Sequence, residues 1–465
     1  MTPDKRMSQR LDRLQDHLKR ENPVLVSVVD RYRTLDGVAQ KIGLLKSSES
    51  YATQISWWPL ISVLGTFSAG KSSFINSYLG LDIQNTGNQA VDDRFTVVTY
   101  SADSEVRTLP GIALDGDPRF PFYQISHDIE QVSEGEGAKI DNYLQMKAAP
   151  SEQVRGKILI DSPGFDADEQ RKSILKLTDH IIDLSDLVLV FFDARHPEPG
   201  AMQDTLEHLV KGAQRRNDTN KFLFILNQID SSAKEDNLED IVAAWQKALV
   251  QTGLSSGRFF VMFNKDLAVP VENKNVWERY VSKRDSDYSK ITKRMEDINV
   301  ERVYRIIGGM ESLANQIEQQ AILQIKQAKQ LWRKRIMWID SLVAFILLAV
   351  ALGGTFWLGL WGLTAIPSPM VLLVASLSLL LIFLILHFFI KKKVAKSIAK
   401  TLSNEESYGS VRQAFLKSTG FFRSVFFSQP AGWGRRTARK LDGIRHDIDL
   451  FVQRLNDKFT SPSGE

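Results

Sequence analysis

Short apolar runs alternate with amphipathic stretches between residues 56 and 270. Each run is five to seven residues long, and most of them are followed by Gly, Asn or Asp, which is typical of strands buried on both faces of a sheet. Strands that alternate with helical stretches predict a doubly wound, mostly parallel α/β domain, with ligands at the strand C-termini. The expected strands are Leu60–Leu64, Phe95–Tyr100, Val154–Ile160, Leu187–Phe192, Phe222–Leu226 and Phe259–Phe263.

Helical periodicity flanks this domain on both sides. Leu11, Leu14 and Leu18 recur at helical spacing among charges near the N-terminus, and a longer apolar stripe runs from Val303 to Trp332. A helix over residues 299–338 would extend about 60 Å at 1.5 Å per residue. A second apolar face near the C-terminus predicts a helix that packs back on this stalk; its members are Leu441, Ile444, Ile448, Phe451 and Leu455.

The hydropathy pattern changes between Ser341 and Ile390, where fifty residues contain no Asp, Glu, Lys or Arg. One helical span needs about 20 apolar residues, so we expect two spans, near 341–363 and 370–390. Pro367-Ser368-Pro369 marks the turn between them, since two prolines cannot continue a helix. A helical hairpin inside a soluble core is disfavoured, because such helices seldom stay free of charge over this length.

Both ends of this segment are basic. Arg333-Lys334-Arg335 precede it and Lys391-Lys392-Lys393 follow it, so the positive-inside rule places both ends, and both termini, on the cytoplasmic side. A re-entrant hairpin that does not fully cross the bilayer is the alternative. Because ionisable residues are nearly absent from the spans, an anchor is favoured over a transporter or channel.

An aromatic and basic segment follows the spans, Phe421-Phe422-Arg423-Ser424-Val425-Phe426-Phe427, with Trp433, Arg435 and Arg436 after it. Beside a membrane anchor, this composition indicates insertion into the bilayer interface. Aromatic packing within a helical bundle explains it equally well.

The amino-acid composition excludes only a few classes of protein and of site. The 465 residues suffice for two or three domains, and 43% hydrophobic with 25% charged residues is ordinary for a globular protein. A net charge of +4 is small for this length and does not indicate a nucleic-acid partner. The absence of cysteine excludes disulfides and thiolate metal sites. The N-terminus shows no apolar signal-peptide core.

Candidate chemistry appears at Gly65–Ser72, which fits the P-loop pattern G-x-x-x-x-G-K-[ST] between an expected strand and an expected helix. Its glycines let successive backbone N–H groups face a polyphosphate at a helix N-terminus. Lys71 would reach the β- and γ-phosphates, and the Ser72 hydroxyl would ligate Mg²⁺. The nucleotide-binding residues expected here are Gly65, Thr66, Phe67, Ser68, Ala69, Gly70, Lys71, Ser72 and Ser73.

Two further motifs stand at strand ends. Asp161-Ser162-Pro163-Gly164 fits the D-x-x-G switch of nucleotide hydrolases, in which Asp161 would hold Mg²⁺ through water and the Gly164 N–H would face the γ-phosphate. Asn227-Gln228-Ile229-Asp230 compares with the N-K-x-D motif, whose aspartate reads the guanine edge. A polar turn at a strand end is the alternative for this second motif.

Together these motifs resemble the dynamin superfamily of membrane-remodelling nucleotide hydrolases, over roughly residues 56–270. The family's P-loop reads G-x-x-S-x-G-K-S, with Ser68 as its serine. The details are most similar to EHD proteins and bacterial dynamin-like proteins: an apolar Phe67, the D-R-F of Asp93–Phe95 and the F-D-A of Phe192–Ala194. No EF-hand loop pattern appears at the C-terminus. The resemblance implies nucleotide-dependent dimerisation, oligomerisation on a bilayer and slow hydrolysis stimulated by assembly.

The first departure from the EHD pattern concerns hydrolysis. Ala90-Val91-Asp92 stands where those proteins read P-T-T, so the threonine of the first switch is missing from its place. Asp92 could substitute as a carboxylate ligand of Mg²⁺, or Thr86 or Thr96 could be recruited. The catalytic residues expected on this basis are Ser68, Lys71, Asp92 and Gly164.

The second departure concerns the base. Gln228 replaces the lysine that packs over the nucleotide base. EHD proteins favour ATP and dynamins favour GTP, so the choice of base stays open. Asp230 favours GTP.

The main hypothesis is a membrane-anchored, dynamin-like nucleoside triphosphatase, GTP favoured, that oligomerises on a cytoplasm-facing membrane and remodels, fuses or stabilises it. Its expected partners are the lipid bilayer and further copies of the chain, through the nucleotide domain and the stalk, and not nucleic acid; Mg²⁺ is the expected cofactor. The alternatives are a non-hydrolysing nucleotide-dependent scaffold and an ATP-using EHD-like protein. The expected domains are N-terminal stalk helices (1–55), a dynamin-type G domain (56–275), a long stalk helix (276–339), a transmembrane hairpin (340–390) and a C-terminal helical region on the stalk (391–465).

Overall fold

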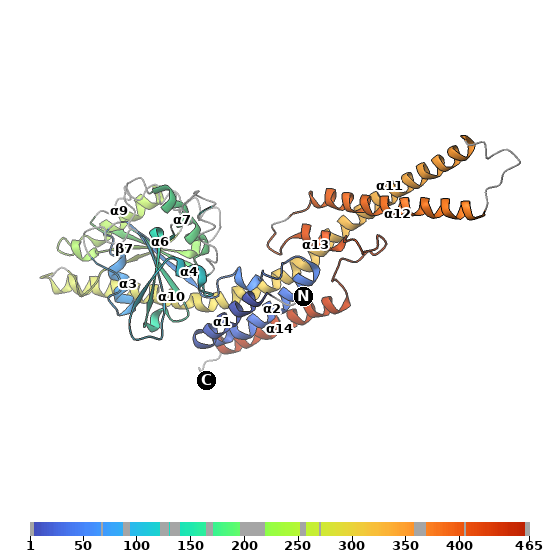
Figure 1. Cartoon of the computed structure of the whole chain (residues 1–465). Helices are drawn as coiled ribbons and strands as arrows, with labels where there is room; N and C mark the ends of the chain where they lie inside the picture. Colours follow the sequence, from blue (N-terminus) through green and yellow to red (C-terminus); the bar gives the residue numbers. More distant parts are fainter. Residues whose placement is uncertain are drawn as a thin grey trace. The chain divides into compact units, whose positions relative to one another are not determined.

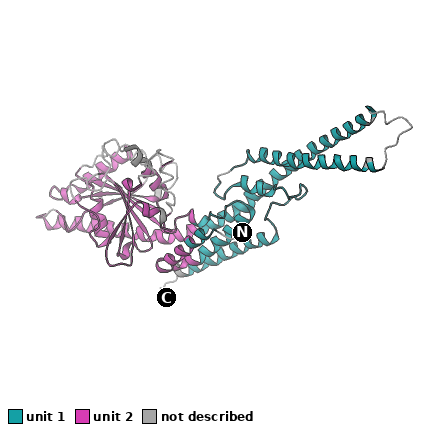
Figure 2. Cartoon of the chain, viewed as in Figure 1, with its two compact units in different colours: residues 1–9, 27–52, 307–465 teal, residues 10–26, 53–306 magenta. Residues whose placement is uncertain are grey.

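The computed structural model describes residues 4–66, 68–86, 94–120, 130, 140–163, 171–195, 219–251, 257–268, 271–357, 369–403 and 406–460. The chain forms two compact units (Figure 2), each described by itself. Unit 1 comprises residues 1–9, 27–52 and 307–465, and unit 2 comprises residues 10–26 and 53–306. The five domains expected from the sequence, and the boundaries between them, stay predictions.

Unit 2 is built on a central sheet (Figure 1), whose eight strands follow the order β3-β4-β2-β5-β1-β6-β7-β8. The strands are β1 (Leu60–Gly65), β2 (Phe95–Tyr100), β3 (Arg107–Pro110), β4 (Leu144–Ala149), β5 (Ile158–Asp161), β6 (Leu187–Asp193), β7 (Phe222–Asn227) and β8 (Arg258–Val261). Five neighbouring pairs are parallel, while β2–β5 and β3–β4 are antiparallel. The expected α/β class with a mostly parallel sheet is confirmed, and β3 and β4 were not foreseen. The strand expected at Val154 begins only at Ile158, because Glu152–Val154 forms a helical turn.

Helices cover both faces of this sheet, which explains why its central strands are apolar throughout. On one face, α3 (Lys71–Leu79) and the middle of α10 (Lys274–Gln316) contribute Phe74, Ile75, Ile291 and Met295 to the core. On the other face, α9 (Leu238–Gln251) contributes Trp245 and Leu249. Other helices among the described residues of unit 2 are α4 (Ile112–Gly116), α6 (Ile140–Tyr143) and α7 (Arg171–Leu184), with helical turns at Pro23–Leu25, Thr219–Lys221 and Ile229–Ser232.

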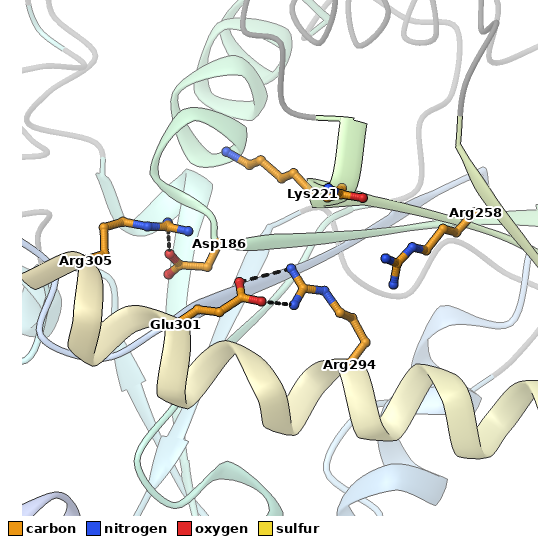
Figure 3. A pocket seen from close by; sticks show the side chains of 7 residues that line it. Asp186, Lys221, Arg258, Arg294, Glu301 and Arg305 are labelled. Carbon is orange, nitrogen blue, oxygen red and sulfur yellow. Dashed lines mark hydrogen bonds and ion pairs between the residues drawn. The ribbon is translucent and has the colours of Figure 1, made fainter. Parts of the chain in front are cut away.

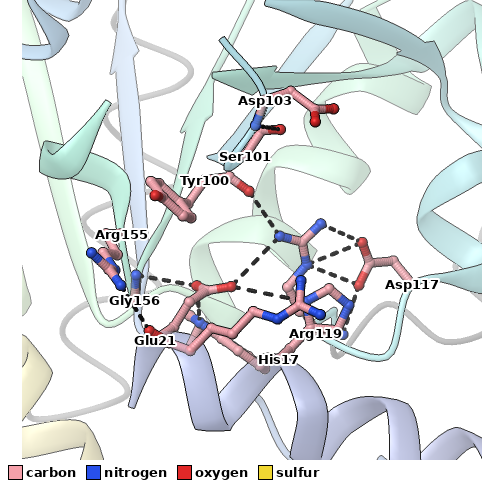
Figure 4. A network of polar contacts seen from close by, with 11 residues as sticks. His17, Glu21, Tyr100, Ser101, Asp103, Asp117, Arg119, Arg155 and Gly156 are labelled. Carbon is pink, nitrogen blue, oxygen red and sulfur yellow. Dashed lines mark hydrogen bonds and ion pairs between the residues drawn. The ribbon is translucent and has the colours of Figure 1, made fainter. Parts of the chain in front are cut away.

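A polar network fastens the end of α1 (Lys5–Glu21) to the sheet (Figure 4). Glu21 accepts hydrogen bonds from Trp58 Nε1 (2.7 Å) and from the backbone N–H of Gly156 (3.2 Å), and its carboxylate lies 3.9 Å from Arg119. Arg119 also donates to Asp117 and to the carbonyl of Tyr100. Burial raises the pKa of Glu21, and the Arg119 charge partly opposes this shift.

Unit 1 is a helical bundle that continues into an apolar hairpin. It contains α2 (Val26–Ile42), the end of α10, a π-helical segment (Ile317–Ala321), α11 (Ile322–Trp357), α12 (Pro369–Ala399), α13 (Val411–Ser418) and α14 (Arg435–Thr460), with a helical turn at Tyr51–Thr53. The expected C-terminal face is buried on α14, and Arg445 donates to Asn315 (3.1 Å) and to Glu318 (2.6 Å). The long helix buries a stripe toward this bundle: Ala314, Ile317, Ala321, Ile325, Ala328, Trp332 and Ile336.

The second half of α11 and most of α12 present apolar side chains outward. Among the described residues, two helices are long and apolar enough to cross a membrane. Asp340 on α11 and His387 on α12 approach to 2.7 Å, and Trp332 Nε1 donates to the carbonyl of Lys391 (3.3 Å). These contacts bring the two ends of the charge-free segment together, as a hairpin requires. The expected turn falls mostly outside the described residues, and Pro369 begins α12.

A buried carboxyl makes the stability of unit 1 depend on pH. Asp36 on α2 accepts hydrogen bonds from the Ser50 hydroxyl (2.5 Å) and from the Tyr51 backbone N–H (2.8 Å). Burial nevertheless raises the pKa of Asp36 to about 6 from 3.8. The folded chain therefore holds a proton that the unfolded chain has lost between these two pH values, so stability falls as pH rises through this window.

We expect Asp36→Asn to remove this loss. Two pKa units correspond to about 3 kcal/mol, and an asparagine keeps both hydrogen-bond partners. Melting temperatures of the full chain in detergent, measured at about pH 4.5, inside this window, and at about pH 7.5, above it, should fall less with pH in the variant than in the wild type. Equal slopes would mean that Asp36 does not titrate there.

Candidate functional site

The glycine loop joins β1 to α3 along a path that only small residues allow. Gly70 caps α3 with φ of +81°, in the left-handed region. A Cβ on Gly65 would lie 2.7 Å from the carbonyl oxygen of Phe191 on β6. Ser68 also has a positive φ, +58°, which strains a side-chain-bearing residue. Strand, loop and helix thus take the arrangement expected from the motif; Phe67 lies outside the described residues.

Lys71 folds back over this loop. Its Nζ donates to the carbonyls of Gly65 (3.0 Å) and Thr66 (3.1 Å), and the residue is 8% exposed. Burial lowers the pKa of Lys71, and the negative charge of Asp161 opposes this shift. The loop therefore concentrates a buried positive charge at the N-terminus of a helix, which favours an anion.

Asp161 ends β5 directly beside the loop strand. Its Cα is paired with that of Val63 on β1, and the next residue, Ser162, donates its backbone N–H to the Val63 carbonyl (3.0 Å). One carboxylate and the hydroxyl of Ser72 at the start of α3 are hard oxygen donors. This donor set fits Mg²⁺, which takes few protein ligands and completes its shell with phosphate and water.

The loop also contacts the end of β7. Asn227 Nδ2 donates to the carbonyl of Ala69 (2.9 Å), and Gln228 Nε2 donates to that of Ser68 (2.5 Å). Gln228 has φ of +61°, and Asp230 follows in a helical turn with only 8% exposure. The side chains of Asn227 and Gln228 thus contact the P-loop, and Asp230 lies in the turn that follows them.

The comparison with protein families decides the relationship of this domain. The model described as the dynamin family matches residues 61–229, which include the glycine loop, Asp161 and Asn227. The chain contains a dynamin-family domain. Its dynamin-family domain is of the GTPase type, a class of nucleotide hydrolases, and this confirms the resemblance read from the sequence.

Solved structures give only distant likenesses. Two structures of an oligomerised bacterial dynamin pair, described as providing a mechanism for long-range sensing and tethering of membranes, match with TM-scores of 0.34 and 0.32. They are 14% and 15% identical, cover 98% and 97% of this chain, and are each covered over 76% of their own length. A dimerisation-deficient mutant of Toc33 from Arabidopsis thaliana matches with a TM-score of 0.30 and 12% identity, over 57% of this chain and 92% of that one. Likenesses this weak support no conclusion about this chain.

Sequence reasoning missed two residues that hold Asp161 in the dynamin-family domain. Gln84 Nε2 donates to Asp161 Oδ2 (2.6 Å), and Lys147 Nζ donates to Gln84 Oε1 (2.6 Å) and to the Ile83 carbonyl (2.7 Å). The side-chain amide of Asn76 on α3 donates to the backbone carbonyl of Gln84 and accepts from its backbone N–H. A buried lysine and a buried glutamine thus orient the carboxylate, and a lysine inside the strand Leu144–Ala149 was the only signal in the sequence.

Other expected residues are placed as follows. Ser73 Oγ accepts a hydrogen bond from Asn264 Nδ2 (3.1 Å), a contact that the motif did not suggest. Thr96 is buried on β2 beside Asp161 and accepts from Gln145 Nε2 (2.8 Å), whereas Thr86 is exposed. Asp92 and Gly164 lie outside the described residues.

A cavity of about 240 Å³ lies at the N-terminal ends of the strands, away from the glycine loop at their C-terminal ends (Figure 3). Asp186, Lys221 and Arg258 stand at the N-terminal ends of β6, β7 and β8, facing Arg294, Glu301 and Arg305 on α10. Glu301 pairs with Arg294, and Asp186 pairs with Arg305, with Arg302 (3.0 Å) and with the backbone N–H of Leu60 (2.9 Å). These charges fasten α10 to the sheet.

Three glycines allow strain and steric contact to be separated in the P-loop region. Gly80→Ala adds only left-handed strain, since nothing lies within 4 Å of its Cβ. Gly70→Ala adds the same strain and a clash with the Asn227 amide. We expect losses of stability of about 1–2 kcal/mol for Gly80→Ala and about 1–3 kcal/mol more for Gly70→Ala. Melting temperatures measure both.

The matched test is the double variant Gly70→Ala with Asn227→Ala, which removes the clashing amide and should recover part of the loss. Gly65→Ala meets the backbone of Phe191, so truncating a side chain cannot relieve it. If the loss in the double variant equals the sum of the losses in Gly70→Ala and Asn227→Ala, contact with the Asn227 amide would not be what destabilises Gly70→Ala.

Proposed function

We propose that this dynamin-family protein is a membrane-anchored nucleoside triphosphatase, with GTP favoured, that oligomerises and remodels, fuses or stabilises a membrane. The observation that carries the proposal is the position of Lys71, on the glycine loop after β1, together with Asp161 at the end of the neighbouring strand β5, in a chain that also has an apolar hairpin. Binding of a magnesium nucleotide requires a cation on the phosphate-binding loop and a carboxylate beside it.

Each residue has a proposed task. Lys71 binds the β- and γ-phosphates, and the loop N–H groups from Gly65 to Ser73 surround them. Ser72 and Asp161 would hold Mg²⁺, which neutralises charge on the phosphates when it is bound. Gln84 and Lys147 keep the Asp161 carboxylate oriented, as outer partners of a metal ligand do.

The remaining assignments rest on the sequence motifs. Ser68, Asp92 and Gly164 are proposed to act at the γ-phosphate, and Asn227 and Asp230 at the base. Asp230 favours guanine, since its carboxylate can accept from the guanine edge. Gln228 in place of the usual lysine leaves the choice of base open, so an ATP-using EHD-like protein is the alternative.

The anchor is proposed to be a two-pass hairpin with both termini in the cytoplasm. Support comes from the basic flanks and from the contact of Asp340 with His387, which sets both ends of the hairpin side by side. Self-association through the dynamin-family domain and the bundle, and contact with the lipid bilayer, complete the proposal.

The deciding experiment uses the purified full chain in liposomes. Binding of labelled GTP and ATP is measured together with multiple-turnover phosphate release, at low and high protein-to-lipid ratio. GTP binding with turnover that rises as the protein assembles is the expected result. Binding without turnover would favour a nucleotide-dependent scaffold, for which the substitution of the switch threonine by Ala90-Val91-Asp92 is the reason. Failure to bind either nucleotide would overturn the proposal.

A further inference from the structure

The segment between α13 and α14 carries four phenylalanines that face solvent. We call residues 420–428 the aromatic loop. Phe421, Phe422, Phe426 and Phe427 are 60%, 97%, 70% and 66% exposed. Burying one such side chain contributes about 1.5–3 kcal/mol, so four exposed phenyl groups on a nine-residue segment are costly in water. Apolar patches of this kind mark contacts with proteins or membranes.

The aromatic loop is held firmly. Lys391 Nζ donates to the carbonyls of Phe421 (2.8 Å) and Arg423 (2.5 Å), and Lys329 Nζ donates to that of Gln429 (2.7 Å). Val425, between the two phenylalanine pairs, is buried against Trp332 and Phe415 in the bundle core. The backbone is therefore fixed from inside while the phenylalanines point away, which is not how core aromatics pack.

Its attachment point lies where the apolar hairpin ends. Lys391 directly follows the charge-free segment, and the ring of Phe421 stacks on that of Phe388 in the last turn of that segment, with centroids 4.4 Å apart. The aromatic surface is thus continuous with the outward apolar surface of α12. Whatever covers the end of α12 also reaches the aromatic loop.

The surrounding charges identify the partner. Arg333 lies over the ring of Phe426 at 5.6 Å, and Arg423 belongs to the loop itself. Exposed Lys334, Arg335, Lys392 and Lys393 occupy the adjoining turns of α11 and α12. Aromatic side chains beside a ring of cations match the boundary between acyl chains and anionic headgroups.

We propose that the aromatic loop inserts into the headgroup–acyl boundary of the leaflet at the basic end of the hairpin, in a membrane with anionic lipid. It is a second contact with the bilayer, made from one side only, and it widens that leaflet beside the two helices. The inference rests on the proposed membrane anchor, because the loop reaches the bilayer only if the hairpin is in it.

The chain contains no cysteine, so a single introduced thiol can be labelled selectively. Ser424→Cys places an environment-sensitive fluorophore on the aromatic loop, and Asp449→Cys places it on the exposed face of α14 as the matched control. The full chain is reconstituted into vesicles of phosphatidylcholine with or without phosphatidylglycerol. Quenching by spin-labelled lipids and by aqueous iodide is then measured.

We expect the label at position 424 to be quenched several-fold more by spin-labelled lipid than the label at 449, and less by iodide. The difference should be larger with phosphatidylglycerol. Phe422→Ser, Phe426→Ser and Phe427→Ser together should return the label at 424 to the iodide-accessible state without releasing the protein.

Resistance of the protein to alkaline carbonate extraction reports the hairpin separately. Extraction of the wild type would count against the anchor. A carbonate-resistant protein whose label at 424 is open to iodide would overturn the inference alone. A label shielded from both quenchers would mean that a second copy or another protein segment covers the loop, and this too would overturn it.

Discussion

Lys71→Ala is expected to weaken nucleotide binding by about 30-fold or more and to abolish turnover, since losing one partner of a buried charge contact costs about 2–5 kcal/mol. Lys71 is the cation that the structure places on the glycine loop, with its Nζ within 3.1 Å of two loop carbonyls. Nucleotide phosphates would replace these neutral partners with charged ones. Equilibrium binding of labelled GTP and ATP to the full chain measures the loss.

The same substitution should not unfold the protein. Burial lowers the pKa of Lys71, which means that the folded chain bears a cost for keeping this side chain charged. We therefore expect the melting temperature without nucleotide to stay the same or rise in Lys71→Ala. The matched control is Lys247→Ala, an exposed lysine on α9 of the same unit, which should bind like the wild type. Wild-type affinity in Lys71→Ala would show that the loop is not the nucleotide site.

Asp186→Ala is expected to destabilise unit 2 by about 3 kcal/mol or more, because it removes a buried carboxylate that balances the charge of a nearly buried arginine. The Asp186 side chain is 2% exposed and binds Arg302, Arg305 and the backbone N–H of Leu60. Arg305 is 52% exposed and can turn to water, so the larger share of the loss falls on Arg302, which is 12% exposed. For a unit of this size the loss corresponds to a fall in melting temperature of about 6–12 °C.

Two variants separate charge from hydrogen bonding at this position. Asp186→Asn keeps an acceptor for the Leu60 N–H and removes only the charge, so its loss should be smaller. Glu301→Gln, in the same cavity, removes a carboxylate that is 45% exposed and keeps an oxygen that can accept from Arg294, so it should cost at most about 1 kcal/mol. If Asp186→Ala melted within a degree or two of Glu301→Gln, the carboxylate would not anchor α10 to the sheet.

Most of the fold and the centre of the candidate site could be predicted from local patterns in the sequence. The glycine loop was predictable because its strand, turn and helix are adjacent in sequence, and the same holds for Asp161 at the end of an apolar run. Strand β4 was not predictable, since its residues Leu144–Ala149 include Gln145 and Lys147, both buried. A strand with polar residues in the interior shows neither an apolar run nor a simple alternation.

The contacts around Asp161 show why the rest of the site could not be read. Gln84 lies in a loop without periodicity, 77 residues from Asp161, and meets it only because α3 and β5 are packed together. Lys147 reaches the same glutamine from a strand 63 residues further on. Such pairs depend on tertiary packing, and a single sequence contains no local signal for them. The aromatic loop is the opposite case: its composition left insertion and core packing equally open, and the exposure of its phenylalanines favours insertion.

The spacing of the buried stripe on the long helix has a consequence for the length of the bundle. From Ala314 to Ile336, successive residues of the stripe are separated by 3, 4, 4, 3, 4 and 4 residues. The π-helical segment Ile317–Ala321 spans the first step of 4. An 11-residue repeat has about 3.67 residues per turn, so the stripe drifts only slightly, in the right-handed sense, and the helix stays nearly straight. Relatives of this chain could therefore lengthen or shorten the stalk by 11 residues, about 16 Å, and keep the same side facing α14, provided the helices packed against it change by the same length.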